Sequence, residues 1–283
     1  MMDIQWFPGH MAKTRRLISE NIRLCDCAVE IVDARCPQSS RNPELPRLVG
    51  GKKVLVVVNK SDIADPNETQ KWIKRFEREG TAAVSVCCND AKGVQKILEA
   101  IREMLKEKIE RDRARGLVNK PIRTMVCGIP NVGKSSFINK LYGKNAAVKG
   151  DRPGVTRGKQ WITLKNGMEF LDTPGILWPK FDDKEAALRL AYTGAVKDDI
   201  LDTEELCAHL CEFLAKNYKS KLEERYKLEL ADEYTGFELL EAICRKRGFI
   251  VKGGAADTLR GASVVLDEFR GGKLGRITLE KAF

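Results

Sequence analysis

A glycine-rich segment offers the clearest chemistry: Gly128-Ile-Pro-Asn-Val-Gly133-Lys134-Ser135 fits the phosphate-binding pattern G-x-x-x-x-G-K-[ST]. The apolar run 122–127 before it looks like a buried strand, and 136–141 after it has helical spacing. Backbone N–H groups of such a loop surround an anion, and the following helix points its positive end at the same place. We expect Lys134 to reach the outer phosphates of a nucleotide and the Ser135 hydroxyl to bind Mg²⁺.

A second motif indicates which base carries these phosphates. Asn59-Lys60-Ser61-Asp62 directly follows a run rich in β-branched residues, 53–58. The Asp62 carboxylate can accept from both N1–H and the exocyclic amine of guanine, whereas adenine offers neither donor and leaves the charge unpaired. Asn59 is expected to bridge the base and the phosphate loop, with the Lys60 stem packed over the base. The two motifs together predict GTP binding.

Four more residues extend the predicted nucleotide site. Asp172-Thr173-Pro174-Gly175 has the form D-x-x-G, in which the acid joins the magnesium shell through water and the glycine N–H meets the γ-phosphate. Thr156 is a candidate switch threonine for the same ion. Ser85 follows the third predicted strand, where a backbone N–H reads O6 of guanine.

These motifs assign a role to each predicted site residue. The predicted magnesium ligands are Ser135, Thr156 and, through water, Asp172, with Lys134 and Gly175 in catalytic roles at the phosphates. The full nucleotide-binding set is Asn59, Lys60, Asp62, Ser85, Asn131, Val132, Gly133, Lys134, Ser135, Ser136, Thr156 and Gly175.

The order of the motifs predicts a permuted fold. In most GTPases the phosphate loop precedes N-K-x-D, but here N-K-x-D lies at 59–62 and the phosphate loop at 128–135. The same sheet forms if the chain is circularly permuted with the cut just after D-x-x-G. The segment that responds to loss of the γ-phosphate then leads into residues 180–283. We therefore expect nucleotide state to set the orientation or docking of that segment.

Strand and helix patterns alternate over the first two thirds of the chain and then become helical. This predicts an α/β fold with a doubly wound, mostly parallel sheet, a circularly permuted Ras-like GTPase domain at 1–179, and an all-helical C-terminal domain at 180–283. Strands are expected at 27–33, 53–59, 82–86, 122–127, 161–164 and 168–172, with a further option at 276–279. Helices are expected at 67–79, 94–113, 183–192, 203–215, 219–228, 237–247 and 257–269.

Composition sets the broad class of protein. Residues 1–183 hold 33 Lys and Arg against 22 Asp and Glu, a net charge of +11, whereas 184–283 carry −1. This excess favours a polyanionic partner, above all RNA, although charge alone is also consistent with solubility. The nine cysteines have no metal-binding spacing and indicate buried free thiols in a reducing compartment. We expect no membrane span, a cytoplasmic location with an organelle matrix as the alternative, and a monomer.

At this point the chain resembles a known family. The motif order, together with Val32-Asp33-Ala34-Arg35 and Phe7-Pro8-Gly9-His10-Met11, is similar to the circularly permuted ribosome-biogenesis GTPases of the RbgA/YlqF branch. The resemblance covers nearly the whole chain and implies a role in maturing the large ribosomal subunit, with activity raised by the ribosomal particle. It also points to His10 as the residue that orients water, because Ile176, which follows Gly175, cannot hydrogen-bond.

The resulting prediction is an assembly GTPase whose nucleotide state controls its association with the precursor of the large ribosomal subunit and its rRNA. Mg²⁺ is the expected cofactor, and Asn131 is a candidate ligand for K⁺, as in potassium-stimulated GTPases. A signalling or transport switch acting on a protein partner is the alternative. A phosphate-loop kinase of metabolism is disfavoured by N-K-x-D.

Overall fold

The computed structural model describes residues 15–16, 18–117, 119–143, 146–149, 161–173, 183–196, 198, 201–230 and 233–283. These residues divide into two compact units, and each is described by itself. The larger unit contains the described residues up to 173 together with 280–283, and the smaller contains those from 183 to 279.

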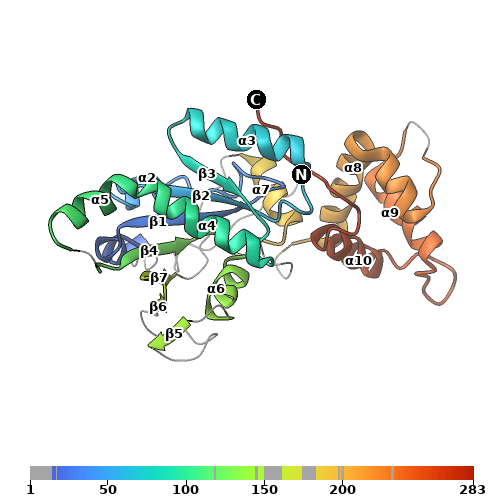
Figure 1. Cartoon of the computed structure of the whole chain (residues 1–283). Coiled ribbons are helices and arrows are strands. Elements are labelled where there is room, and N and C mark those ends of the chain that lie inside the picture. The colour runs from blue at the N-terminus through green and yellow to red at the C-terminus, as the bar shows by residue number, and fades with distance from the viewer. Residues whose placement is uncertain are drawn as a thin grey trace. The chain divides into compact units, whose positions relative to one another are not determined.

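The larger unit is built on a seven-stranded sheet in the order β3-β2-β1-β4-β7-β6-β5 (Figure 1). The strands β3, β2, β1, β4 and β7 are parallel, whereas β6 is antiparallel to β7 and β5 is antiparallel to β6. Their bounds are β1 Cys27–Asp33, β2 Val54–Asn59, β3 Ala82–Ser85, β4 Ile122–Cys127, β5 Ala146–Lys149, β6 Trp161–Leu164 and β7 Met168–Asp172. β1 is buried along its whole length, as expected for a central parallel strand covered on both faces.

Helices cover both faces of this sheet. On one face, α3 packs Trp72, Ile73 and Phe76 against the even-numbered side chains of β1 and β2. On the other, Phe137 of α6 lies edge-on to Phe170 of β7, with ring centroids 5.8 Å apart. The helical segments of this unit include η1 Ile22–Leu24, α2 Leu45–Leu48, α3 Pro66–Arg78, α4 Ala91–Met104, α5 Lys106–Ala114 and α6 Lys134–Gly143. The doubly wound fold class is therefore confirmed.

The predicted helix 94–113 is two helices, because the backbone leaves helical geometry at Leu105. α4 buries Val94, Ile97, Leu98 and Ile101 on one side, so its apolar stripe fixes it to the sheet. α5 has no buried residue and carries a high density of charge. The break at Leu105 thus separates a core helix from a surface helix.

The smaller unit is helical, with α7 Lys184–Tyr192, α8 Thr203–Tyr226, α9 Gly236–Arg247 and α10 Thr258–Arg270. α8 contains a non-helical residue, Tyr218 (φ −142°, ψ 37°), close to the gap between the helices expected at 203–215 and 219–228. The core comes from α8, α9 and α10, and includes Leu210, Leu240 and Val265. The strand considered at 276–279 is wrong, since these residues form no ladder in the described structure.

The segment 280–283 lies in the sheet-containing unit. The Glu280 carboxylate accepts from the backbone N–H groups of Gln38 and Ser39 at 2.8 and 3.0 Å, and from the Ser39 hydroxyl at 2.8 Å. Trp72 donates its indole N–H to the Glu280 carbonyl at 2.9 Å. Ala282 packs against the core between α3 and the sheet. The predicted second domain included these residues, and the difference arises from long-range contacts that local pattern does not encode.

All nine cysteines are free thiols, and each is buried except Cys87, which is half-buried. Burial raises the pKa of Cys25 and Cys127 to about 12, so both remain protonated at neutral pH. In the part of the chain that the structure describes, no helix is long and apolar enough to cross a membrane, and no three His, Cys, Asp or Glu side chains group as metal ligands.

Candidate nucleotide-binding site

Parallel strands bring the predicted motifs to one edge of the sheet. Asp33 ends β1, Asn59 ends β2 and Asp172 ends β7, while the phosphate loop follows the end of β4. Because these strands run in the same direction, their carboxyl ends meet at one edge, where α/β sheets bind ligands. Segments far apart in the chain therefore converge on one site.

The phosphate loop connects β4 to α6 with the geometry that its glycines allow. Gly133 has φ +96°, and a Cβ atom there would lie 2.1 Å from the side-chain nitrogen of Asn59. Gly128 has φ +157°, and its Cβ would lie 2.8 Å from the carbonyl oxygen of Ile31. Both positions exclude a side chain because neighbouring strands approach the loop closely. Asn131 has a left-handed conformation (φ +61°) that asparagine tolerates better than most residues.

Asn59 joins the guanine motif to two other loops. Its side-chain Nδ2 donates to the Val132 carbonyl at 2.7 Å, and its Oδ1 accepts from the Cys88 N–H at 2.8 Å. Asn59 is 3% exposed, so both bonds are shielded from water. Breaking either leaves a buried polar group unsatisfied, at a cost of about 1–3 kcal/mol. This one amide therefore fixes the separation between the phosphate loop and the guanine motif.

Lys60 forms a salt bridge with Asp33, which is itself part of a buried ion pair with Arg35. Its Nζ atom lies 3.1 Å from Oδ2 of Asp33, and the side chains of Asp33 and Arg35 are 2% and 1% exposed. Arg35 donates from Nε to Oδ1 of Asp33 at 3.0 Å and from Nη2 to Oδ2 at 2.9 Å. Burial by itself raises the pKa of Asp33, but the charges of Arg35 and Lys60 outweigh it and hold this pKa far below its usual value. Asp33 is thus ionised throughout the physiological range.

Asp62 lies exposed beside the segment that follows β3. The Cys87 thiol forms a hydrogen bond with the Asp62 side chain. Burial raises the pKa of Cys87 most, and this bond raises it further. Ser85, which sequence reasoning assigned to the base, is the last residue of β3, and its carbonyl accepts from Lys96 at 3.1 Å. Cys87 contacts Asp62, and the Cys88 N–H contacts Asn59, so two residues that follow β3 also join the guanine motif. The sequence signal for these two residues is their position directly after the third predicted strand.

At the phosphate end, the Lys134 ammonium lies 2.9 Å from Oδ1 of Asp172. The next residue, Thr173, donates its hydroxyl to the Val126 carbonyl at 2.6 Å, which ties the start of D-x-x-G to β4. Ser135 and Ser136 follow Lys134 in the first turn of α6, and Ser135 is exposed. A hydroxyl and a carboxylate are the hard oxygen donors that suit Mg²⁺, so the donor set fits this ion. His10, Thr156 and Gly175 lie outside the described residues.

Comparisons with known proteins agree with this arrangement. A family described as "50S ribosome-binding GTPase" matches residues 123–234. The match starts within β4, so it contains the phosphate loop but not the guanine motif at 59–62. Ribosome biogenesis GTPase A of Bacillus cereus is 47% identical over 99% of this chain and 94% of its own length. The Thermotoga maritima protein of that name is 32% identical over 98% of this chain and 94% of its own length.

Two solved structures support the same conclusion. The GDP-bound structure of TM YlqF has a TM-score of 0.70 and 27% identity, and the match covers 94% of this chain and 99% of that one. The GNP-bound YlqF from T. maritima has a TM-score of 0.66 at 26% identity, covering 95% of this chain and 98% of that one. The resemblance drawn from the motifs is confirmed. This chain, with its circularly permuted motif order, is a GTPase and belongs to the ribosome biogenesis GTPase A family.

Proposed function

We propose that this GTPase is an assembly factor for the large ribosomal subunit and that its nucleotide state controls its association with the precursor particle. The observation that carries the proposal is the junction at Asn59, which joins N-K-x-D to the phosphate loop in a chain of this family. The net charge of +11 over residues 1–183 supports rRNA as the surface contacted.

Guanine is selected by the exposed carboxylate of Asp62. With Asn59 and Lys60 held by the contacts described above, Asp62 presents its oxygens to N1–H and the exocyclic amine of the base. The Lys60 stem covers the base, and its Nζ atom is paired with the buried Asp33 carboxylate. A backbone N–H of the segment from Ser85 to Cys88 reads O6. This arrangement discriminates against adenine because its edge leaves Asp62 unpaired.

The phosphates lie on the loop 128–135, in the field of the N-terminus of α6. GTP binding would replace the Lys134–Asp172 ion pair, because Lys134 would bind the outer phosphates and leave the Asp172 carboxylate available to the ion. Ser135 and Thr156 would hold Mg²⁺ directly and Asp172 would hold it through water, and the bound ion would neutralise charge on the phosphates. The Gly175 N–H binds the γ-phosphate.

Hydrolysis requires a group that orients water, and the position after Gly175 is an isoleucine, Ile176. We assign this role to His10, whose near-neutral imidazole can orient water or accept its proton. Asn131, which is exposed in the phosphate loop, is our candidate ligand for K⁺ beside the β- and γ-phosphates. The protein acts as a monomer in the cytoplasm, and the ribosomal particle raises its turnover.

Co-sedimentation tests the function directly. The full chain is mixed with purified bacterial large ribosomal subunits, mature or precursor, in the presence of a non-hydrolysable GTP analogue, GDP or no nucleotide, at two salt concentrations. The analogue is expected to give markedly stronger association than GDP. Equal association in the three states would contradict nucleotide control. No association with any subunit preparation would favour a signalling or transport switch acting on a protein.

A further inference from the structure

A pocket of about 580 Å³ opens at the edge of the sheet opposite to the phosphate loop. Its lining includes Asp26, just before β1, Ile122, the first residue of β4, and Gly167, just before β7. These positions mark the amino ends of the parallel strands. Since a strand rises roughly 3.3 Å per residue, the six residues of β4 separate the pocket from the phosphate loop by nearly 20 Å. The pocket is therefore a separate site.

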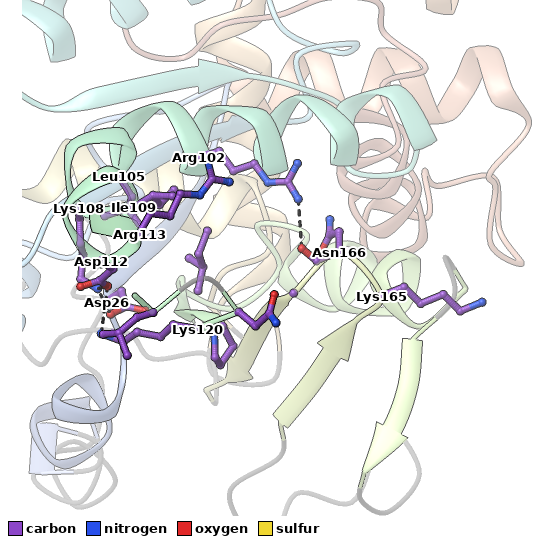
Figure 2. A pocket seen from close by; sticks show the side chains of 15 residues that line it. Asp26, Arg102, Leu105, Lys108, Ile109, Asp112, Arg113, Lys120, Lys165 and Asn166 are labelled. Carbon is purple, nitrogen blue, oxygen red and sulfur yellow. Dashed lines mark hydrogen bonds and ion pairs between the residues drawn. The ribbon is translucent and has the colours of Figure 1, made fainter. Parts of the chain in front are cut away.

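A group of ion pairs builds one side of the pocket (Figure 2). Lys108 lies 2.8 Å from Asp26 and 3.1 Å from Asp112, and Lys120 lies 3.1 Å from Asp112. Hydrogen bonds from Lys120 and Lys108 lower the pKa of Asp112, so these charges persist at neutral pH. Two lysines and two aspartates balance one another. They attach α5 and the segment before β4 to the start of β1 without adding net charge.

The remaining charged side chains of the lining are all basic. Arg102, Arg113 and Lys165 have no carboxylate partner within the described part of the chain, which leaves the lining with a net charge of +3. Arg102 donates to the Asn166 carbonyl at 3.3 Å, which orients its guanidinium along the pocket (Figure 2). Lys165 extends away from the other labelled side chains in this view. Arg102 on α4 and Arg113 on α5 therefore add positive charge to a pocket that the ion pairs already hold in shape.

α5 itself supports a binding role. None of its residues is buried, so α5 adds nothing to the core of this unit. Packing therefore does not account for its many charged side chains. Arg111 and Arg115 are exposed on the same helix and its end, close in sequence to Arg113. A mostly charged surface helix is held in place by ion pairs, here those of Lys108 and Asp112, and the rest of its surface is available to solvent or a partner.

We propose that this pocket, with Arg102 and Arg113 as its principal contacts, binds the phosphodiester backbone of RNA in the ribosomal particle. The inference rests on the proposed function, and it assigns a surface of this chain that contacts the ribosomal particle. Guanidinium groups match phosphate oxygens in a bidentate manner, and the Asn119 and Asn166 amides can bond sugar hydroxyls. The described lining contains no aromatic side chain, whereas the cores of protein–protein interfaces are enriched in them. RNA is therefore favoured over an acidic protein.

The test compares two double variants of the full chain. Arg102→Ala with Arg113→Ala removes the two exposed arginines, and Lys74→Ala with Arg78→Ala removes two exposed cations from α3 as a control of equal charge. Binding of a 20-base-pair RNA duplex and of purified large subunits is measured across a salt series, beside a polyglutamate peptide. GTP affinity and GTPase rate without ribosomes are measured for every variant.

The pocket variant is expected to lose roughly tenfold or more in RNA affinity and about two units of the slope of log K against log salt. The control should keep both, and neither variant should change GTP affinity. Equal RNA binding by the two variants would overturn the inference, as would a loss confined to polyglutamate. Failure of the proposed function looks different, because the wild-type chain would then not bind large subunits.

Discussion

The Nζ atom of Lys60 lies 3.1 Å from Oδ2 of Asp33, so the lysine of the guanine motif is positioned by the last residue of the neighbouring strand. Asp33 and Asn59 are also direct partners in the β1–β2 ladder. The end of β1 therefore supports the end of β2 through backbone pairing and through charge. Asp33 therefore contributes to the geometry of guanine binding although it lies outside the N-K-x-D motif.

Asp33→Asn should weaken both the fold and guanine binding. The amide leaves the buried Arg35 without its counter-charge, and truncating one partner of such a pair costs about 3–5 kcal/mol. Freeing Lys60 should lower GTP and GDP affinity roughly tenfold. Isothermal calorimetry and urea unfolding measure the two effects. Glu77→Gln, at an exposed position on α3, is the matched control and should change neither.

The pH dependence of stability in Asp33→Asn distinguishes the effect of the lost charge from the effect of altered packing. Because the folded-state pKa of Asp33 is depressed, its stabilisation is complete above its unfolded pKa of about 3.9 and is lost as pH falls towards the folded value. The stability gap between wild type and Asp33→Asn should stay constant from pH 7 to 5. Below about pH 4 it should narrow by about 1.4 kcal/mol per pH unit. A gap independent of pH would show that packing, rather than ionisation, is responsible.

Gly133→Ala and Gly167→Ala form a pair that isolates the close approach at the phosphate loop. Both glycines have positive φ, +96° and +80°, so each substitution should cost about 1 kcal/mol of stability. Only at Gly133 does the new Cβ meet a neighbour, Asn59, while nothing lies within 4 Å at Gly167. Equilibrium dialysis with GDP should therefore show a loss of at least tenfold for Gly133→Ala and no change for Gly167→Ala. Similar affinities would mean that the loop relaxes without moving Asn59.

Glu280→Gln should destabilise the sheet-containing unit. The substitution weakens three hydrogen bonds to Gln38 and Ser39, and charge-assisted bonds contribute about 1.5–3 kcal/mol. Lys281→Ala, at the exposed neighbouring position, should be silent. Removing 280–283 altogether should also shift Trp72 fluorescence to the red, since its indole N–H loses the Glu280 carbonyl. Unchanged melting temperature and emission would show that the segment is dispensable.

His10→Ala should slow hydrolysis while leaving GTP affinity nearly intact. Loss of a group that orients or deprotonates water typically costs about 10²-fold or more in rate. Single-turnover GTPase assays with and without large ribosomal subunits measure this, and binding of a GTP analogue serves as the control. If turnover on the ribosome is unchanged, His10 has no part in the mechanism.

Potassium should accelerate hydrolysis more than sodium if Asn131 binds the cation. Asn131→Gly removes the amide, while glycine adopts the observed φ of +61° without strain. The variant should therefore remain folded and bind GDP, but lose the difference between the two salts. Equal wild-type rates in KCl and NaCl at matched ionic strength would exclude the cation.

Local motifs made the sheet and much of the site predictable. The phosphate loop and N-K-x-D are contiguous, and the unbroken apolar runs before them are typical of central parallel strands, so both could be placed at strand ends. The break at Leu105 was missed because the helical spacing of apolar residues continues through it. The short strand Ala146–Lys149 was missed because its pattern is too brief to stand out.

Other features depend on contacts that only the folded chain reveals. Arg35 lies within two residues of Asp33, yet nothing local indicates that its guanidinium is buried rather than exposed. Cys87 and Cys88 reach the guanine motif through the pairing of β2 with β3 and the close approach of α4 at Gly93, whose Cβ would lie 2.3 Å from the Cys87 carbonyl oxygen. Such roles require the register of neighbouring strands.

The contact of Glu280 with Gln38 and Ser39 has a consequence for biosynthesis. During translation, the residues up to 173 emerge well before 280–283, with the helical unit made in between. The nascent sheet can collapse early, but its loop beside Asp33 acquires its last partners only after the helical unit has been synthesised. The GTP site of a growing chain should therefore mature late, so that tight nucleotide binding coincides with the presence of the helical unit.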